Sequence, residues 1–184
     1  VRVIDDFSAS LINECTAPTE RIRMETLDVL VSLARALRGR GPLRLRKEDF
    51  VRAFKTLPLA LSALCMAAAA WGEAAQEGWA LLLWCCPFGA VASVYAWGRF
   101  GGAVQAILGR PFFAPAGRFV GDLFGIDPEG GWAEGPLAGA AGASRVSRFV
   151  IGTLLGWELD EEKRASSAES AEVLGVTVTV INKP

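Results

Sequence analysis

The pattern of apolar and polar positions predicts a chain that mixes strands with helices. Residues 1–13 read as an extended segment that ends in the turn-forming run 8–10 before residues 11–13. From Thr16 to Arg38 apolar residues recur at helical spacing and Gly39 follows, which predicts one long helix. Residues 173–181 alternate valine, threonine and isoleucine, a pattern typical of a strand. Together these segments favour the α+β class.

Two apolar stretches, Leu57–Trp71 and Trp79–Trp97, lie in the middle of the chain. As a pair they resemble a transmembrane hairpin. However, the first has only 15 residues, six of them alanine, and the second is interrupted by Pro87 and Gly89, whereas a spanning helix needs about 20 strongly apolar residues. We therefore expect helices within 57–110 and no stable membrane insertion, with a small membrane protein as an alternative.

Toward the C-terminus the composition changes twice. Residues 125–144 are rich in glycine, alanine and proline, which indicates a loop, and residues 145–157 are compatible with a helix. Leu159 to Ser167 reads as a polar turn.

Composition narrows the possible chemistry. At 184 residues and 52% hydrophobic, the chain can bury one sizeable core. It has no histidine, which excludes Ser-His and Cys-His catalysis and the usual zinc sites. Its four cysteines lack the C-x-x-C spacing, so we expect reduced, buried thiols in an intracellular protein of the cytoplasm or nucleus. The chain starts at Val1 without methionine or a signal peptide, and we expect it to be part of a longer protein.

Charge is distributed unevenly along the chain. Residues 20–55 hold ten Lys or Arg against five Asp or Glu, while residues 119–172 hold four against ten. A basic segment suits phosphate contacts, although arginines on a helix are also common on its solvated face. No glycine-rich phosphate-binding motif is present, so any nucleotide contact has to come from other groups.

Four short motifs carry the strongest functional signal, and they follow one another in a characteristic order. They are Arg2 to Phe7 with Asn13, Asp49 followed five residues later by Phe54, the run Cys86-Pro87-Phe88-Gly89, and the hairpin-like stretch 118–124. In this order and at these spacings the chain resembles a reverse transcriptase of a retroelement, from the late fingers through the palm. The resemblance implies an antiparallel palm sheet backed by helices, with a partial fingers segment in 1–43 and the palm in 44–184.

The resemblance also implies a site. Asp49 and Asp122 match the catalytic, metal-binding aspartates, and two Mg²⁺ ions would activate the primer hydroxyl and clamp the triphosphate. The nucleotide-binding positions that match are Arg2 toward the triphosphate, Phe54 under the sugar, Gly89 at a close approach to the template-nucleotide pair and Lys163 near the leaving pyrophosphate. The implied partners are an RNA or DNA template-primer and a deoxynucleoside triphosphate.

Two residues of the metal-binding box depart from the family pattern. In the aromatic-x-Asp-Asp box, Phe119 replaces the usual tyrosine and Gly121 replaces the first aspartate, which is the closer metal ligand in the family. We therefore expect nucleotidyl transfer to be weak or lost. The run after Gly89 also lacks the family's Asn-Ala-Pro.

Simpler interpretations stay open for each motif. Asp49 could cap a turn beside a core Phe54, a Gly-x pair in 118–124 could form a plain type II′ hairpin, and Lys163 could be a solvated turn lysine. A second functional alternative is a non-catalytic nucleic-acid-binding palm remnant that uses Arg2, Arg21, Arg23 and the basic linker 44–47 on phosphates.

Overall fold

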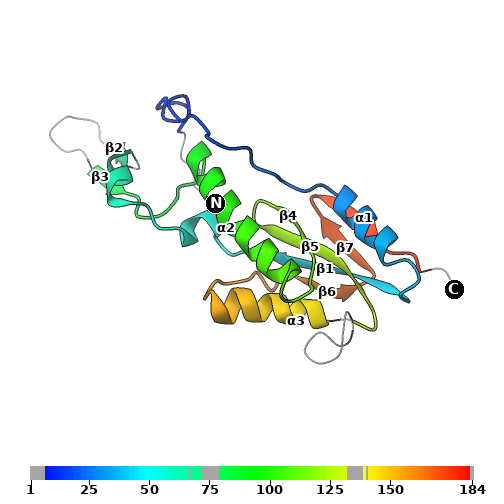
Figure 1. Cartoon of the computed structure of the whole chain (residues 1–184). Helices are drawn as coiled ribbons and strands as arrows, with labels where there is room; N and C mark the ends of the chain where they lie inside the picture. The colour runs from blue at the N-terminus through cyan, green and yellow to red at the C-terminus, as the bar shows by residue number, and fades with distance from the viewer. Residues whose placement is uncertain (1–6, 67, 72–78, 132–138, 140, 183–184) are drawn as a thin grey trace. The chain divides into compact units, whose positions relative to one another are not determined.

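The computed structural model describes residues 7–66, 68–71, 79–131, 139 and 141–182 (Figure 1). The chain forms two compact units, one from Val1–Ile22 and Arg52–Arg99 and the other from Arg23–Val51 and Phe100–Pro184. The predicted division into fingers 1–43 and palm 44–184 stays a prediction.

The second unit is built on a four-stranded antiparallel sheet in the order β4-β5-β1-β6. The strands are β1 (Leu43–Asp49), β4 (Gly117–Phe119), β5 (Asp122–Pro128) and β6 (Ala165–Ala168). Helices flank this sheet, so the α+β class with a helix-backed antiparallel sheet is confirmed. Strand β1 lies between β5 and β6 and pairs with a strand along each edge, and its side chains alternate between the two faces of the sheet.

One face of β1 carries the main apolar core. Leu43 and Leu45 pack there with Phe124 and Ile126 of β5. Helix α1 (Asp28–Ala36) and the hairpin of β7 (Ser170–Val173) and β8 (Val176–Thr179) cover these residues, chiefly through Leu30, Leu37 and Val173. Further along the same face, alternation places Lys47 and Asp49 beyond the core.

The opposite face of β1 buries charge instead. Arg46 is 1% exposed and donates hydrogen bonds to Asp127, Ser147 and the carbonyl of Pro115. Glu48 is fully buried and accepts a hydrogen bond from Ser144. Both serines belong to α3 (Gly142–Arg148), which continues into a π-helical turn, η4 (Phe149–Leu154).

The first unit contains little helix among its described residues. It holds two 3₁₀ segments, η1 (Ala53–Thr56) and η2 (Leu61–Met66), and a hairpin of β2 (Ala68–Trp71) and β3 (Trp79–Leu82). Helix α2 (Val91–Gly109) begins in this unit and ends in the second one. Of the residues that the structure describes, none belongs to a helix long and apolar enough to cross a membrane.

Several predicted elements differ from the structure. The predicted helix 16–38 is only α1, because backbone groups before it bond elsewhere: the amide of Glu25 donates to the carbonyl of Arg118. The predicted loop 125–144 overlaps two elements, because β5 runs to Pro128 and α3 begins at Gly142. The basic linker expected at 44–47 lies inside β1.

Other elements are confirmed with adjusted bounds. The strand expected at 173–181 is the shorter β8, and Val173 belongs to its partner β7. The helix expected at 145–157 is α3 followed by η4. Of the helices expected within 57–110, α2 forms, but parts of the two apolar stretches are the strands β2 and β3 instead. The polar turn expected at 159–167 already contains the start of β6. Of the extended segment expected at 1–13, residues 1–6 lie outside the described residues, and residues 7–13 form a run of turns.

Candidate carboxylate site

Asp49 and Asp122 stand side by side at one end of the sheet. Strand β1 ends at Asp49, strand β5 begins at Asp122, and the two residues are directly opposite in the antiparallel ladder. Directly opposite residues point to the same face with Cβ atoms about 5 Å apart. The side chains are 14% and 27% exposed. The fold thus brings together two carboxylates that are 73 positions apart in sequence.

The hairpin that carries Asp122 has a strained turn. Phe119 pairs with Asp122, so Val120 and Gly121 are the two turn residues, and the predicted hairpin is confirmed. The left-handed conformation lies at Val120, with φ 50°, rather than at the glycine. A type II′ turn has glycine at this first position, and a β-branched residue there is an outlier. Gly121 contributes its carbonyl, which accepts a hydrogen bond from the amide of Phe50 at 3.0 Å.

A lysine from the C-terminal part of the chain forms an ion pair with Asp49. Lys163 Nζ lies 2.5 Å from Asp49 Oδ2 and 3.2 Å from Asp160 Oδ2. The hydrogen bond to Asp49, followed by that to Asp160, raises the pKa of Lys163. The loop is also tied to the strand end, because the amide of Asp160 donates to the carbonyl of Asp49 at 2.9 Å. Lys163 is thus placed next to Asp49, as a counter-charge.

A second lysine faces Asp122. Lys47 Nζ lies 3.4 Å from Asp122 Oδ1, and its side chain is only 13% exposed. Burial raises the pKa of Asp122, the nearby charge of Lys47 opposes this rise, and the charge of Asp49 adds to it. Two carboxylates and two ammonium groups therefore make up the candidate site.

This set of donors does not match a two-ion magnesium centre. Such centres hold two cations about 4 Å apart through several oxygen ligands. Among the described residues no group of three or more metal-binding side chains is assembled. Both aspartates already face a lysine, and Gly121 has no side chain to offer. Magnesium binding by Asp49 and Asp122 stays a prediction.

The other predicted site residues are not part of the carboxylate site, or they lie outside the residues that the structure describes. Phe54 is buried in the first unit and packs edge-to-face on Phe88, with ring centroids 5.0 Å apart. Gly89 has φ 88°, which requires glycine, and its carbonyl accepts a hydrogen bond from Asn13 at 2.9 Å. Arg2 lies outside the described residues. Their roles in nucleotide binding stay predictions.

The alternative of a nucleic-acid-binding remnant grouped Lys47 with Arg44 and Arg46 as phosphate contacts, whereas Lys47 faces Asp122. Arg46 is buried against Asp127, and Arg44 forms ion pairs with Glu129 and Glu169. These two arginines therefore do not provide the phosphate contacts expected of the basic linker. The signal was present as a period of two in Leu43 to Asp49, which places Lys47 on the side of Asp49.

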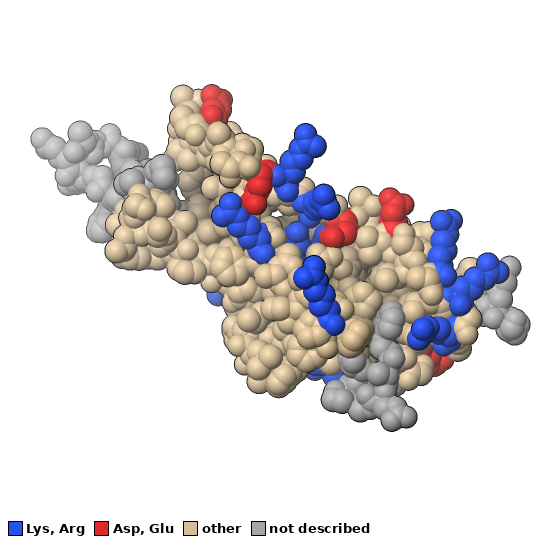
Figure 2. All heavy atoms as spheres, viewed as in Figure 1, with Lys and Arg blue, Asp and Glu red and all other residues tan. Residues whose placement is uncertain are grey.

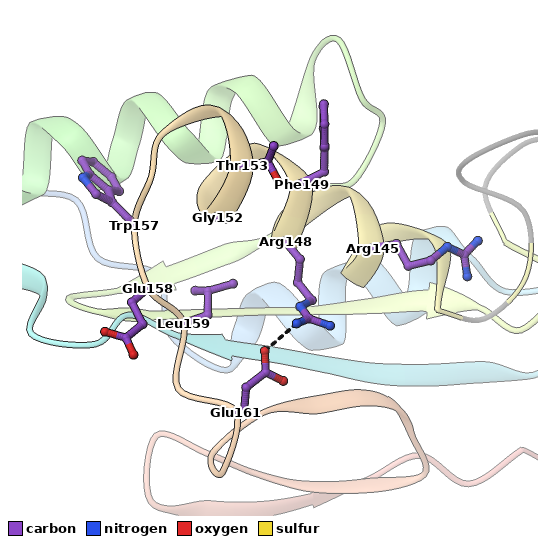
Figure 3. Close-up of a pocket in the computed structure, with 9 residues that line it drawn as sticks. All are labelled: Arg145, Arg148, Phe149, Gly152, Thr153, Trp157, Glu158, Leu159 and Glu161. Carbon is purple, nitrogen blue, oxygen red and sulfur yellow. Dashed lines mark hydrogen bonds and ion pairs between the residues drawn. The ribbon is translucent and has the colours of Figure 1, made fainter.

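A separate pocket of about 590 Å³ lies beside α3 and η4 (Figure 3). Arg148 crosses from α3 to the facing loop, where it donates to Glu161 at 2.7 Å. Trp157 and Phe149 add aromatic surface, while Arg145 and Glu158 lie toward opposite ends in the view shown. Acidic and basic side chains balance in this lining, so the pocket has no strong preference for an anion.

Comparisons with known proteins show the fold. No protein-family model and no curated protein matches the chain. A foamy viral protease-reverse transcriptase in complex with double-stranded DNA matches with a TM-score of 0.66 and 15% identity, over 97% of this chain and 27% of that one. The same kind of protein in complex with an RNA/DNA hybrid matches with a TM-score of 0.61 and 16% identity, over 95% and 20% of the two chains. The chain thus has a reverse-transcriptase-like fold and spans about a quarter of these structures or less.

Proposed function

We propose that this chain is a reverse-transcriptase-like palm with part of the fingers that binds a nucleic-acid duplex and has lost efficient metal-dependent nucleotidyl transfer. The observation that carries the proposal is that both carboxylates of the site are already paired with lysines. Asp49 and Asp122 occupy adjacent ladder positions, yet each faces a lysine.

The physical argument concerns charge balance at the end of the sheet. In a two-metal polymerase the carboxylates hold divalent cations, which meet the charge that develops on the transferring phosphoryl group. Here one carboxylate is replaced by Gly121, and two ammonium groups balance the remaining two. A divalent cation has to displace Lys163 from Asp49 before it binds there. This competition lowers metal affinity and, with it, metal-dependent catalysis.

Nucleic-acid binding is supported by a different set of observations. Two of the solved structures that share this fold are complexes, one with double-stranded DNA and one with an RNA/DNA hybrid. The first third of the chain is basic, and phosphate contacts supply most of the sequence-independent affinity for nucleic acid.

Restoring the missing carboxylate tests the catalytic part of the proposal. Mn²⁺ binding to the full chain is measured by titration calorimetry for the wild type and for Gly121→Asp. The added carboxylate should tighten Mn²⁺ binding about tenfold, which corresponds to 1.4 kcal/mol. Gly152→Asp is the matched control, because Gly152 is exposed and a side chain there meets only one atom, at 3.9 Å.

Primer extension provides the second readout. Magnesium-dependent extension of an RNA/DNA primer should be weak for the wild type and rise with Gly121→Asp but not with Gly152→Asp. Strong extension by the wild type would show that the lysines and Gly121 do not impair catalysis. Absence of any binding to a nucleic-acid duplex would remove the binding half of the proposal.

A further inference from the structure

The basic residues that follow Asp28 divide into two groups with different surroundings. Between Asp28 and Glu48 the sequence holds six basic residues and no acid. Three of them lie on β1 and face carboxylates of the same unit: Arg44, Arg46 and Lys47. The other three, Arg35, Arg38 and Arg40, lie at the end of α1 and in the turn that follows.

These last three arginines form an exposed cluster, which we call the α1 arginine cluster. All three are exposed, and in the described part of the chain no carboxylate lies within ion-pairing distance of any of them. Figure 2 shows Lys and Arg side chains gathered near the end of α1. Three unneutralised positive charges within six residues repel one another, and an external polyanion relieves that repulsion.

The local backbone holds the cluster outward. Leu30 and Leu37 bury the inner stripe of α1 in the core, so Arg35 and Arg38, three residues apart, share the outer side. After the helix, Gly39 and Gly41 adopt φ 92° and 89°. These left-handed glycines turn the chain back toward β1 while Arg40 remains exposed.

The position of the cluster relates it to the carboxylate pair. Helix α1 packs on the face of β1 that also carries Asp49. Strand β1 starts three residues after Arg40, and its seven residues span about 20 Å to Asp49. A duplex rises about 3.4 Å per base pair, so about six base pairs bridge this length.

We propose that the α1 arginine cluster binds the phosphate backbone of a nucleic-acid duplex, independently of its sequence. This inference rests on the proposed function and assigns it a surface. Arginine pairs well with phosphate because its planar donors match the phosphate oxygens. A membrane is a poorer partner, because an interfacial helix inserts its apolar face, and that face of α1 is already buried in the core.

A matched pair of double variants tests the cluster in the full chain. Arg35→Gln with Arg38→Gln removes two cluster charges, and Arg145→Gln with Arg148→Gln removes two exposed charges of the same spacing from α3 on the other face of the sheet. Binding to a fluorescent RNA/DNA hybrid of about 20 base pairs is measured by anisotropy over a range of salt concentrations. The α1 variant should bind about tenfold more weakly, and its salt slope should fall by about 2, since each phosphate contact contributes nearly one unit.

The α3 variant is the control that distinguishes a specific role of the cluster from a general effect of lost positive charge. The α3 variant should keep affinity and salt slope within about twofold of the wild type, and circular dichroism should show both variants folded. If the wild type binds the hybrid and the α1 variant binds it equally well, the cluster is not the backbone site although the proposed function stands. If the wild type does not bind the hybrid at all, both proposals fail. If the α1 variant loses binding to phosphatidylserine vesicles but not to the hybrid, the partner is a membrane and the inference is wrong.

Discussion

The two faces of β1 use ionic side chains in opposite ways. On one face Arg46 and Glu48 are fully buried and bonded to partners from β5 and α3. On the other face leucines fill the core, and the charged residues Lys47 and Asp49 come only at its partly open end. Charge on the first face fixes how α3 sits on the sheet. Charge on the second face is available for chemistry or binding, because water and ligands can reach it.

The largest expected effect comes from breaking the buried ion pair. Arg46→Met leaves the carboxylate of Asp127 buried without its arginine, and such a change costs about 3–5 kcal/mol. Chemical denaturation should show this loss. The double variant Arg46→Met with Asp127→Leu should recover most of it, because an apolar pair can replace a buried ion pair. Equal stability of the single and double variants would contradict the structural role of this pair.

A truncation on the leucine face of β1 should cause a similar loss of stability, without a second substitution that restores it. Leu45 is fully buried, and Leu45→Ala should lower the free energy of unfolding by about 3 kcal/mol through lost burial and the cavity left behind. Leu61→Ala, at a residue that is 78% exposed, serves as the control and should change stability by less than about 0.5 kcal/mol. A loss below 1 kcal/mol for Leu45→Ala would mean that this face is not the core.

A smaller and opposite effect is expected in the turn before Asp122. Val120→Gly relieves a left-handed conformation that costs a β-branched residue about 1–3 kcal/mol, and part of this gain is lost to the flexibility of glycine when unfolded. We expect a net stabilisation of about 1 kcal/mol in denaturant titrations. The matched control Val176→Gly, which removes a strand valine with no positive φ, should destabilise instead. A loss for both variants would mean that Val120 is not strained.

The smallest effect is a change in how stability depends on pH, caused by Glu48 on the buried-charge face of β1. Burial raises the pKa of Glu48 above its ordinary value, against the opposing effects of Ser144 and nearby arginines. The folded state therefore binds this proton more tightly than the unfolded state, and stability falls as pH rises from the ordinary pKa through the raised one. Glu48→Gln removes this contribution, so its stability relative to the wild type should increase with pH. Glu162→Gln, at an exposed position, should show no such trend.

Local patterns were sufficient for several parts of the fold. The hairpin around 120–121 and the C-terminal strand depend on side-chain alternation and turn residues that are close in sequence. Strand β1 was expected as a basic linker at 44–47, and only the family resemblance implied a strand end at Asp49. The predicted helix was longer than α1, because the helical spacing of apolar residues continues through residues 16–27. In that segment the backbone forms other hydrogen bonds, as at Glu25. Propensity is a weak signal, and such long-range contacts override it.

The sequence by itself determined that Asp122 follows a tight turn and that Gly121 carries no carboxylate, whereas the strand that ends at Asp49 was expected as a basic linker. Only the tertiary structure decided that the two aspartates are opposite each other and that Lys163 and Lys47 face them. It also decided which basic residues between Asp28 and Glu48 are neutralised and which stay exposed. The reason is that ladder register and ion pairing join residues far apart in the chain, and such distant neighbours leave no periodic signal in a single sequence.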